Sequence, residues 1–407
     1  MTFFRGGVFP LIFTVLYFVL PHALSQEHQQ HRQSAASLAS GVAVSPSGDI
    51  WLAGVFEKRL FIQILREGIA RWDEKRFIDN DGEVVSTSGD NWPKIAFGPN
   101  GKVIISYTKP LSKPYTGEIR LLRSEDQGVT FTKPYTAHQD RQIITHRFDS
   151  IVFDQRGDLY VLWIDKRDVE AVRKLNSDNT DSVKNKNPVP EYEGAAIYYN
   201  VSGDGGKSFG SDKKVADHSC ECCRIAVLSN QGGGISAMWR HVFDGSVRDH
   251  AFARLDRYQA TSVQRASFDN WVLKVCPHHG PGLARAENKQ YHAVWFGEKE
   301  GKFAGRYGLL DETGRPIGAV RVLPDERAEH ADVISLEKKV VIAWRSFDGM
   351  KTSVFAWISD DGGITFHKQL LFVSEGKNDY PRLTSHGNNI FVIWRTESEI
   401  HVEKIIH

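Results

Sequence analysis

The chain has 407 residues, and its 51 lysines and arginines are almost balanced by 50 aspartates and glutamates. This balance argues against electrostatic capture of nucleic acid or of an anionic membrane surface, so we expect neither as a partner. The length suits one large all-β domain or two ordinary domains, and four cysteines are too few for a scaffold held together by disulfides.

The first 25 residues predict a secretory signal peptide. Arg5 precedes an apolar run from about Val8 to Leu20, and Ala23 and Ser25 supply small residues before a cleavage site. The apolar run is shorter than an ordinary membrane span. We therefore expect an exported protein, periplasmic or secreted, with no membrane span after signal cleavage.

One pattern recurs seven times along the chain: a short apolar strand, a turn that often carries Gly or Asn, and a second apolar strand that usually ends in an aromatic residue. The copies lie at residues 40–55, 93–107, 149–163, 223–239, 281–295, 331–344 and 381–394. Short β-branched and aromatic runs between such turns are typical of strands.

A four-stranded module repeated at about fifty residues predicts a β-propeller. We expect an all-β, seven-bladed propeller in one domain over residues 26–407, with six blades as the alternative. The segment 169–195 is polar and carries Pro and Asn, so it is expected to be an inserted loop in the third blade.

Three segments share the pattern Ser-x-Asp-x-Gly-x-Thr/Ser-Phe, and each follows the third expected strand of its module. They read SEDQGVTF (124–131), SGDGGKSF (202–209) and SDDGGITF (359–366). The Ser and Asp side chains can bond the backbone of their own turn, and the Gly can adopt a positive φ. The residues that would build these turns are Ser124, Asp126, Gly128, Ser202, Asp204, Gly206, Ser359, Asp361 and Gly363.

With these motifs and hairpins, the chain resembles the sialidase-like, Asp-box (BNR-repeat) β-propeller superfamily. The resemblance implies that the Asp boxes are structural turns away from an active site. It also implies glycoside hydrolysis, for which sialidases use three arginines that hold the substrate carboxylate, a Tyr nucleophile paired with a Glu, and an Asp acid/base. The family motif Phe/Tyr-Arg-Ile-Pro is missing from the first hairpin, SGVAVSPSGDIWLAGV, so an exo-α-sialidase-like enzyme would need a non-standard site.

Aligning the inner strands places several charged or aromatic side chains at one mouth of the central channel. They are Lys94, Arg224, Asp332, His330, Tyr380 and Arg382. Together they predict a site for a small anionic or glycan ligand. Arginines beside apolar strands also commonly cover apolar surface or pair with a nearby Asp, which is the structural alternative.

The segment DHSCECCRIAV (217–227) places three of the four cysteines just before the innermost strand of the fourth blade, and Cys223 is expected to begin that strand. The fourth cysteine stands in the corresponding segment of the fifth blade. Consecutive blades bring such segments together, so we expect one cluster of Cys220, Cys222, Cys223, Cys276, His278, His279 and His250. The combination of CxCC, RDHA and CPHHGP resembles a subgroup of exported bacterial Asp-box proteins labelled sialidase-like.

Three interpretations of the cluster stay open. A disulfide from Cys222 or Cys223 to Cys276 would tie two blades together. Thiolates with imidazoles would favour a metal ion, with copper ahead of zinc. A redox thiol pair would use Cys220 and Cys223, which match C-x-x-C, with Arg224 beside them. The leading functional hypothesis is metal binding at the channel mouth; a sialidase-type glycosidase is the alternative, and a protein-binding propeller is third.

Overall fold

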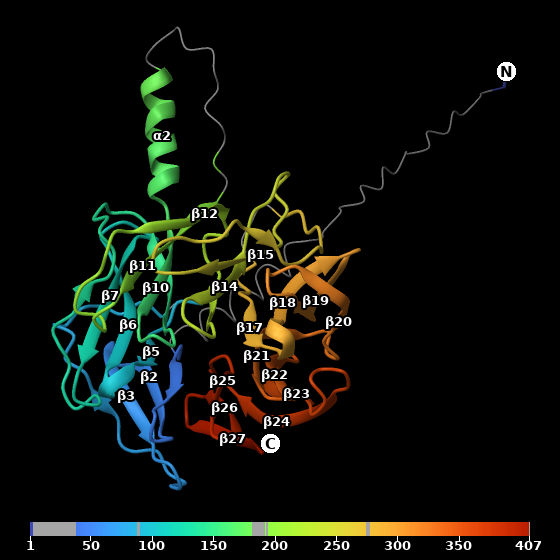
Figure 1. The fold of residues 1–407 in the computed structure, drawn as a ribbon. Coiled ribbons are helices and arrows are strands. Elements are labelled where there is room, and N and C mark those ends of the chain that lie inside the picture. Colours follow the sequence, from blue (N-terminus) through green and yellow to red (C-terminus); the bar gives the residue numbers. More distant parts are fainter. Residues whose placement is uncertain (3–37, 88–89, 181–191, 193, 274–276, 407) are drawn as a thin grey trace.

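The computed structural model describes residues 1–2, 38–87, 90–180, 192, 194–273 and 277–406. Within these ranges the chain forms seven small antiparallel sheets arranged in a ring, six of them four-stranded and one three-stranded. The protein is therefore a seven-bladed β-propeller (Figure 1), as the repeated hairpins predict.

Each blade is an up-and-down meander that runs from the channel outward. Blade one holds β1 (Gly41–Val44), β2 (Ile50–Phe56), β3 (Arg59–Leu65) and β4 (Arg76–Phe77). Blade two holds β5 (Lys94–Phe97), β6 (Val103–Pro110), β7 (Gly117–Ser124) and β8 (Tyr135–Thr136). Blade three holds β9 (His146–Phe153), β10 (Leu159–Asp165), β11 (Ala195–Ser202) and β12 (Lys213–Ser219). Blade four holds β13 (Ala226–Ser229), β14 (Ile235–Arg240), β15 (His250–Leu255) and β16 (Gln264–Arg265).

The remaining blades continue the same order. Blade five holds β17 (Gly282–Arg285), β18 (Tyr291–Lys299), β19 (Lys302–Leu310) and β20 (Pro316–Val322). Blade six holds β21 (Ala328–Leu336), β22 (Lys339–Phe347), β23 (Lys351–Ser359) and β24 (His367–Glu375). Blade seven holds β25 (Arg382–His386), β26 (Asn389–Arg395) and β27 (Ile400–Ile406). Two 3₁₀ turns, η1 (Pro99–Gly101) and η2 (Glu287–Lys289), lie in inner hairpins.

The core lies between blades. Six buried apolar clusters each join two consecutive blades, from blades one and two through blades six and seven. The aromatic residues that end the recurring second strands include four tryptophans among the largest fully buried side chains, namely Trp163, Trp239, Trp344 and Trp394. Burial of these side chains between sheets explains why the repeat is visible in the sequence.

The ring closes through contacts between the two ends of the described β-structure. Ser40, just before β1, donates from its backbone N–H and its Oγ to Asp379 Oδ2 at 2.8 and 2.7 Å. Arg382, at the start of β25, donates from Nε to the Ser40 carbonyl oxygen at 2.8 Å. Strands β1 and β25 lie side by side as a result.

The three Ser-x-Asp-x-Gly segments form tight turns between the third and fourth strands of their blades. In blade three, Ser202 Oγ donates to Asp204 Oδ1 and accepts the N–H of Gly206, both at 2.7 Å. The segments at 124–131 and 359–366 repeat these bonds. Because neighbouring strands are antiparallel, these turns lie at the opposite end of the blade from the start of the innermost strand.

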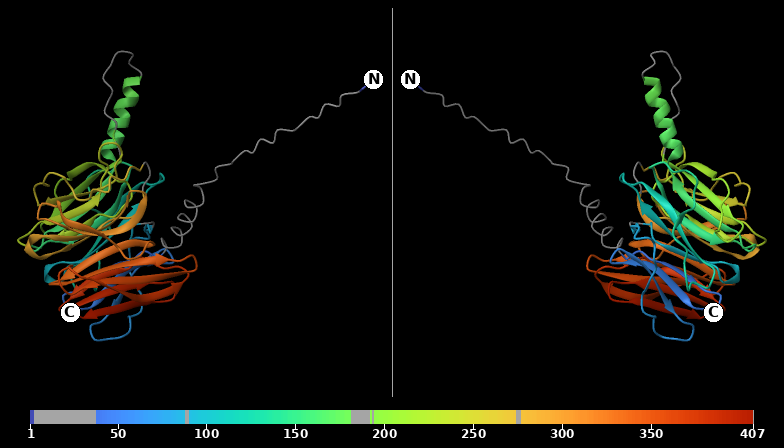
Figure 2. Two further views of the ribbon diagram at one scale, coloured as in Figure 1. Left: turned by 90° about the vertical axis from the view of Figure 1, so that its right-hand side faces the viewer. Right: turned by 90° about the vertical axis from the view of Figure 1, so that its left-hand side faces the viewer.

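The insertion in blade three differs from the prediction. Residues 169–195 were expected to be a loop, but the 14-residue helix α2 (Arg167–Thr180) forms its first part and projects away from the blades (Figure 2). Asp165 Oδ1 accepts the N–H of Arg167 at 2.8 Å, and Asp168 and Glu170 stand in the first helical turn, where acidic side chains stabilise a helix. The polar composition that suggested a loop instead reflects a helix with little packing on it.

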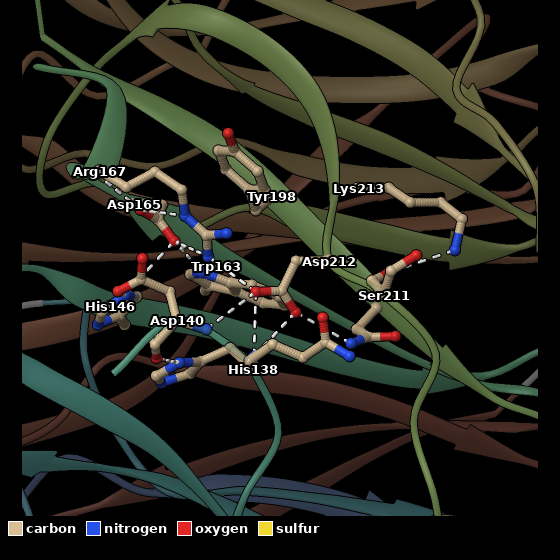
Figure 3. A network of polar contacts seen from close by, with 12 residues as sticks. His138, Asp140, His146, Trp163, Asp165, Arg167, Tyr198, Ser211, Asp212 and Lys213 are labelled. Atoms are coloured by element: carbon tan, nitrogen blue, oxygen red, sulfur yellow. Dashed lines mark hydrogen bonds and ion pairs between the residues drawn. The ribbon is translucent and has the colours of Figure 1, made fainter. Parts of the chain in front are cut away.

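A buried polar network anchors the base of α2 (Figure 3). Arg167 Nη2 contacts Asp165 Oδ2 at 2.7 Å and Asp212 Oδ2 at 2.9 Å, and Trp163 Nε1 donates to Asp165 at 2.7 Å. His146 stacks on His138, with ring centroids 4.1 Å apart. The network joins the end of β10, the residue before β12 and the start of β9 to the first residue of α2.

No helix in the described ranges is long and apolar enough to cross a membrane. The predicted signal peptide, residues 1–25, falls almost entirely outside the described residues, so export stays a prediction.

Candidate functional site

The candidate site lies where the innermost strands begin, which we call the charged mouth and define by Asp90, Lys94, Arg224, Glu329, His330, Arg345, Tyr380 and Arg382. At its centre, Asp90 is 1% exposed, and its Oδ2 accepts the N–H groups of Arg224 and Gly280, each at 3.1 Å. Burial raises the pKa of Asp90 above its ordinary value, against the attraction of Arg224 and Arg382. Asp90 Oδ1 forms no hydrogen bond with the described residues.

Two arginines of the charged mouth are fixed by backbone carbonyl groups. Arg224 donates from Nε to the carbonyl oxygen of Pro281 at 2.9 Å and from Nη2 to that of Ala331 at 2.6 Å. Arg382 donates from Nε to Ser40, as described above, and its Nη2 lies 3.5 Å from Asp379 Oδ1. In both guanidinium groups, Nη1 makes no hydrogen bond within the described part of the chain, so it is available to a ligand.

A third arginine, Arg345, differs from its counterparts in other blades. A Trp-Arg pair lies at or near the end of the second strand of blades four, six and seven. In blade four, Arg240 donates to the carbonyl oxygen of Phe296 at 2.6 Å, and in blade seven Arg395 donates to that of Val55 at 3.2 Å. Arg345 is 2% exposed, yet its Nε and Nη1 have no hydrogen-bond acceptor among the described residues. Buried donors of this kind are costly unless something pairs with them.

Tyr380 lies among these cations. The Cζ atoms of Arg345 and Arg382 lie 5.5 and 5.8 Å from the centroid of its ring. Burial, with a contribution from Asp90, raises the pKa of the Tyr380 hydroxyl. The backbone N–H of Tyr380 donates to Asp379 Oδ1 at 2.7 Å, which fixes the segment before β25.

His330 covers the ring of Tyr380. Their ring centroids lie 3.6 Å apart, and the His330 ring also stacks on that of His279 at 4.4 Å. The register of β21 against β22 shifts between Glu329 and Asp332, and His330 has a φ of 51°. Such a bulge redirects a side chain, and here it brings His330 into the charged mouth. Glu329 Oε2 lies 3.8 Å from His330 Nε2 and 3.6 Å from Arg345 Nε.

Lys94 extends the cationic surface toward blade two. Its Nζ lies 3.3 Å from Asp149 Oδ1 and 4.8 Å from the ring centroid of Trp92, over which Arg382 also stacks at 3.7 Å. Burial lowers the pKa of Lys94, and Asp149 opposes that effect. Lys94 is thus held by a carboxylate and an aromatic face.

The structure brings most predicted ligand-binding residues together but adds others. Lys94, Arg224, His330, Tyr380 and Arg382 meet at the charged mouth, and Asp332 contributes to the electrostatic environment of Arg382. Sequence reasoning missed Asp90, Glu329 and Arg345. The recurring Trp-Arg pair was a signal for an arginine, but only the structure shows that Arg345 lacks the acceptor that its counterparts have.

The loop before β13 holds Cys220, Cys222 and Cys223. The expectation that Cys223 begins the innermost strand was wrong, because β13 starts at Ala226. The sulfur atoms of Cys220 and Cys223 lie 3.7 Å apart, which is longer than a disulfide bond, and Arg248 Nη1 donates to Cys220 Sγ at 3.5 Å. The hydrogen bond from Cys223, with nearby Arg240 and Arg248, lowers the pKa of Cys220 to about 6, whereas burial raises that of Cys223.

The other predicted cluster members spread apart. Cys222 Sγ lies 3.7 Å from His278 Nε2, while His279 stacks on Phe296 and His330. His250 packs near Trp295, with ring centroids 6.3 Å apart, and burial holds its pKa well below the usual range.

Within the described part of the chain, no group of three or more His, Cys, Asp or Glu side chains is placed to hold a metal ion. The leading hypothesis of copper or zinc binding therefore gains no support from the geometry. Cys276 lies outside the described residues, so its predicted bridge to Cys222 or Cys223 and its predicted place in a metal site both stay predictions.

No family model and no curated protein matches the sequence. Among solved structures, the Hadza microbial sialidase Hz136 matches 86% of this chain and 74% of its own, with a TM-score of 0.52 and 12% identity. A PL25 ulvan lyase bound to -[GlcA(1-4)Rha3S]- matches 92% and 95%, with a TM-score of 0.55 and 10% identity. YCF48 bound to D1 peptide matches 91% and 94%, with a TM-score of 0.50 and 13% identity. These likenesses show the fold alone. The neighbours are sialidase-like and related propellers.

Proposed function

We propose that the protein is a glycoside hydrolase of the sialidase type that acts on an acidic sugar at the charged mouth. The observation that carries the proposal is Arg345, a buried guanidinium whose Nε and Nη1 lack acceptors among the described residues and which lies beside Tyr380. A substrate carboxylate would supply the acceptors that the protein does not. Arginine is well suited to this role because its planar fork binds a carboxylate through two hydrogen bonds.

The proposed substrate carboxylate lies among three guanidinium groups. Arg224 and Arg382 are oriented by backbone carbonyl groups and keep Nη1 available, and the Cζ atom of Arg345 lies 5.5 Å from the centroid of the Tyr380 ring. Because these groups are already buried and oriented, binding an anion costs little further ordering. Glu329 forms an ion pair with Arg345 Nε at 3.6 Å, but a neutral sugar would leave Nη1 of Arg345 without an acceptor, so the site should favour an acid.

Two carboxyl groups would carry the proton transfers. Asp90 has a raised pKa, which favours the protonated form that a general acid needs for the glycosidic oxygen. Tyr380 would attack the anomeric carbon, and Glu329 would accept its hydroxyl proton. A water molecule, activated by Asp90 after it has given up its proton, would then release the sugar. Tyr380 is 5% exposed beneath His330, so we expect the His330 ring to swing aside when substrate binds.

The test measures hydrolysis of a fluorogenic sialoside, with the matching neutral glycoside as the comparison substrate. We expect turnover of the acidic substrate alone, and we expect its loss in Tyr380→Phe. Tyr199→Phe is the matched control, because Tyr199 is a buried tyrosine of β11 whose hydroxyl lacks a hydrogen bond among the described residues. Equal turnover of the neutral glycoside, or full activity of Tyr380→Phe, would contradict the proposal. If the protein instead releases an unsaturated uronic acid from an acidic polysaccharide, it is a lyase that acts by elimination, and the hydrolase proposal is wrong.

A further inference from the structure

A buried dithiol lies behind the charged mouth, in the loop between β12 and β13. Cys220 and Cys223 are 1% and 2% exposed, and their sulfur atoms lie 3.7 Å apart. A disulfide needs about 2.05 Å, so a movement of roughly 1.7 Å within a C-x-x-C loop would join them. The Cys220 N–H donates to the Arg240 carbonyl oxygen at 2.9 Å, which anchors the first cysteine to β14.

The two thiols have different surroundings. Arg248 donates to Cys220 Sγ at 3.5 Å, and Arg240 adds a second nearby positive charge, so the surroundings favour a thiolate at Cys220. Burial raises the pKa of Cys223, which favours its thiol form. This asymmetry gives the pair an attacking sulfur and a second thiol that can resolve the product.

We propose that Cys220 and Cys223 form a reversible redox centre that reacts with hydrogen peroxide. The Cys220 thiolate attacks one peroxide oxygen and expels hydroxide, which leaves a sulfenic acid. Cys223 then loses its proton and attacks the Cys220 sulfur, and the hydroxyl group departs as water. One dithiol and one peroxide give one disulfide and two waters, with two electrons passing from sulfur to peroxide. An external dithiol reverses the reaction by exchange.

Burial selects the oxidant. A peptide-sized disulfide must bring its sulfur in line with the attacking thiolate, and side chains that are 1% and 2% exposed do not allow this approach. Hydrogen peroxide is little larger than water and needs only a local fluctuation of the loop. The centre should therefore respond to peroxide and resist oxidised glutathione.

The experiment uses the full-length protein, reduced with dithiothreitol and freed of the reductant. Equal portions receive hydrogen peroxide or oxidised glutathione, and remaining thiols are alkylated before peptide mapping. We expect peroxide to link Cys220 to Cys223, while oxidised glutathione leaves both alkylated in the same time. Cys223→Ser should instead accumulate a sulfenic acid at Cys220 that dimedone captures.

Other outcomes would overturn the proposal. One is a peroxide-dependent link from Cys220 or Cys223 to another cysteine. The others are oxidation by glutathione disulfide as fast as by peroxide, and thiols that resist peroxide because a co-purified metal ion holds them. The comparison of the two oxidants uses the wild-type chain, so it decides the question even if a serine variant folds poorly.

Discussion

Replacing Asp90 by Asn should abolish hydrolysis while leaving the fold at least as stable. The Asn side chain has the shape of Asp, and its carbonyl oxygen can accept the same N–H groups of Arg224 and Gly280. It cannot donate a proton to a leaving group as a carboxylic acid does, so kcat should fall by about 10²- to 10⁴-fold. The same substitution removes the cost of burying a negative charge.

The stability difference should depend on pH in a defined direction. The folded-state pKa of Asp90 is raised above the ordinary value of 3.8, so the folded protein binds more protons than the unfolded chain above that pH. The stability that Asp90 provides is therefore greatest at low pH and is lost as pH rises through the raised pKa. Each unit by which the pKa is raised corresponds to about 1.4 kcal/mol. Asp90→Asn lacks this loss and should gain on the wild type as pH rises.

Urea unfolding of both proteins from about pH 4 to about pH 7 measures this difference. Asp126→Asn serves as the control of opposite sign, because the hydrogen bond from Thr130 lowers the pKa of Asp126 to about 2. That variant should be less stable than the wild type near neutral pH, and its deficit should shrink as pH falls. If the curves of wild type and Asp90→Asn stay parallel over the whole range, Asp90 has no raised pKa and the argument for a general acid fails.

Four further substitutions test separate parts of the account. Arg345→Lys should lower kcat/KM for the acidic substrate by about 10- to 100-fold with little loss of stability. Arg395→Lys should lower the free energy of unfolding and spare activity per folded molecule. A loss of stability in Arg345→Lys without a loss of activity would contradict this. Ser202→Ala should cost about 1–3 kcal/mol in urea unfolding and leave kcat unchanged, since the turn lies away from the charged mouth. Arg167→Ala leaves the buried Asp165 carboxylate without its ion pair and should cost about 3–5 kcal/mol; an unchanged unfolding midpoint would show that the network of Figure 3 contributes little.

The blades could be predicted from sequence because the signals for each hairpin lie within its own short stretch of residues. Short apolar strands, turn residues between them and, in most copies, a large aromatic near the end of the second strand are local signals, and the hairpin repeats seven times. Helix α2 escaped prediction for the converse reason. Its residues carry few apolar side chains, so no helical period is visible, and its start depends on Asp165, which lies at the end of β10.

The charged mouth could be predicted only in part. Residues aligned with the inner strands, such as Lys94 and Arg382, follow from the repeat. Asp90 stands in an irregular segment between blades, where alignment gives no guide. Arg345 looks the same in sequence as Arg240 and Arg395, and what distinguishes it is whether the neighbouring blade offers a carbonyl oxygen, which is a property of the assembled ring.

The most direct test of the central claim is a covalent trap of the proposed nucleophile. A sialosyl fluoride with a second fluorine beside the anomeric carbon has a good leaving group, and the added fluorine slows hydrolysis of the glycosyl–enzyme. The account predicts that the intact mass rises by one sugar, that peptide mapping places the sugar on Tyr380, and that Tyr380→Phe gains none. Hydrolysis of sialosides with no adduct on Tyr380, or an adduct on a different residue, would contradict it.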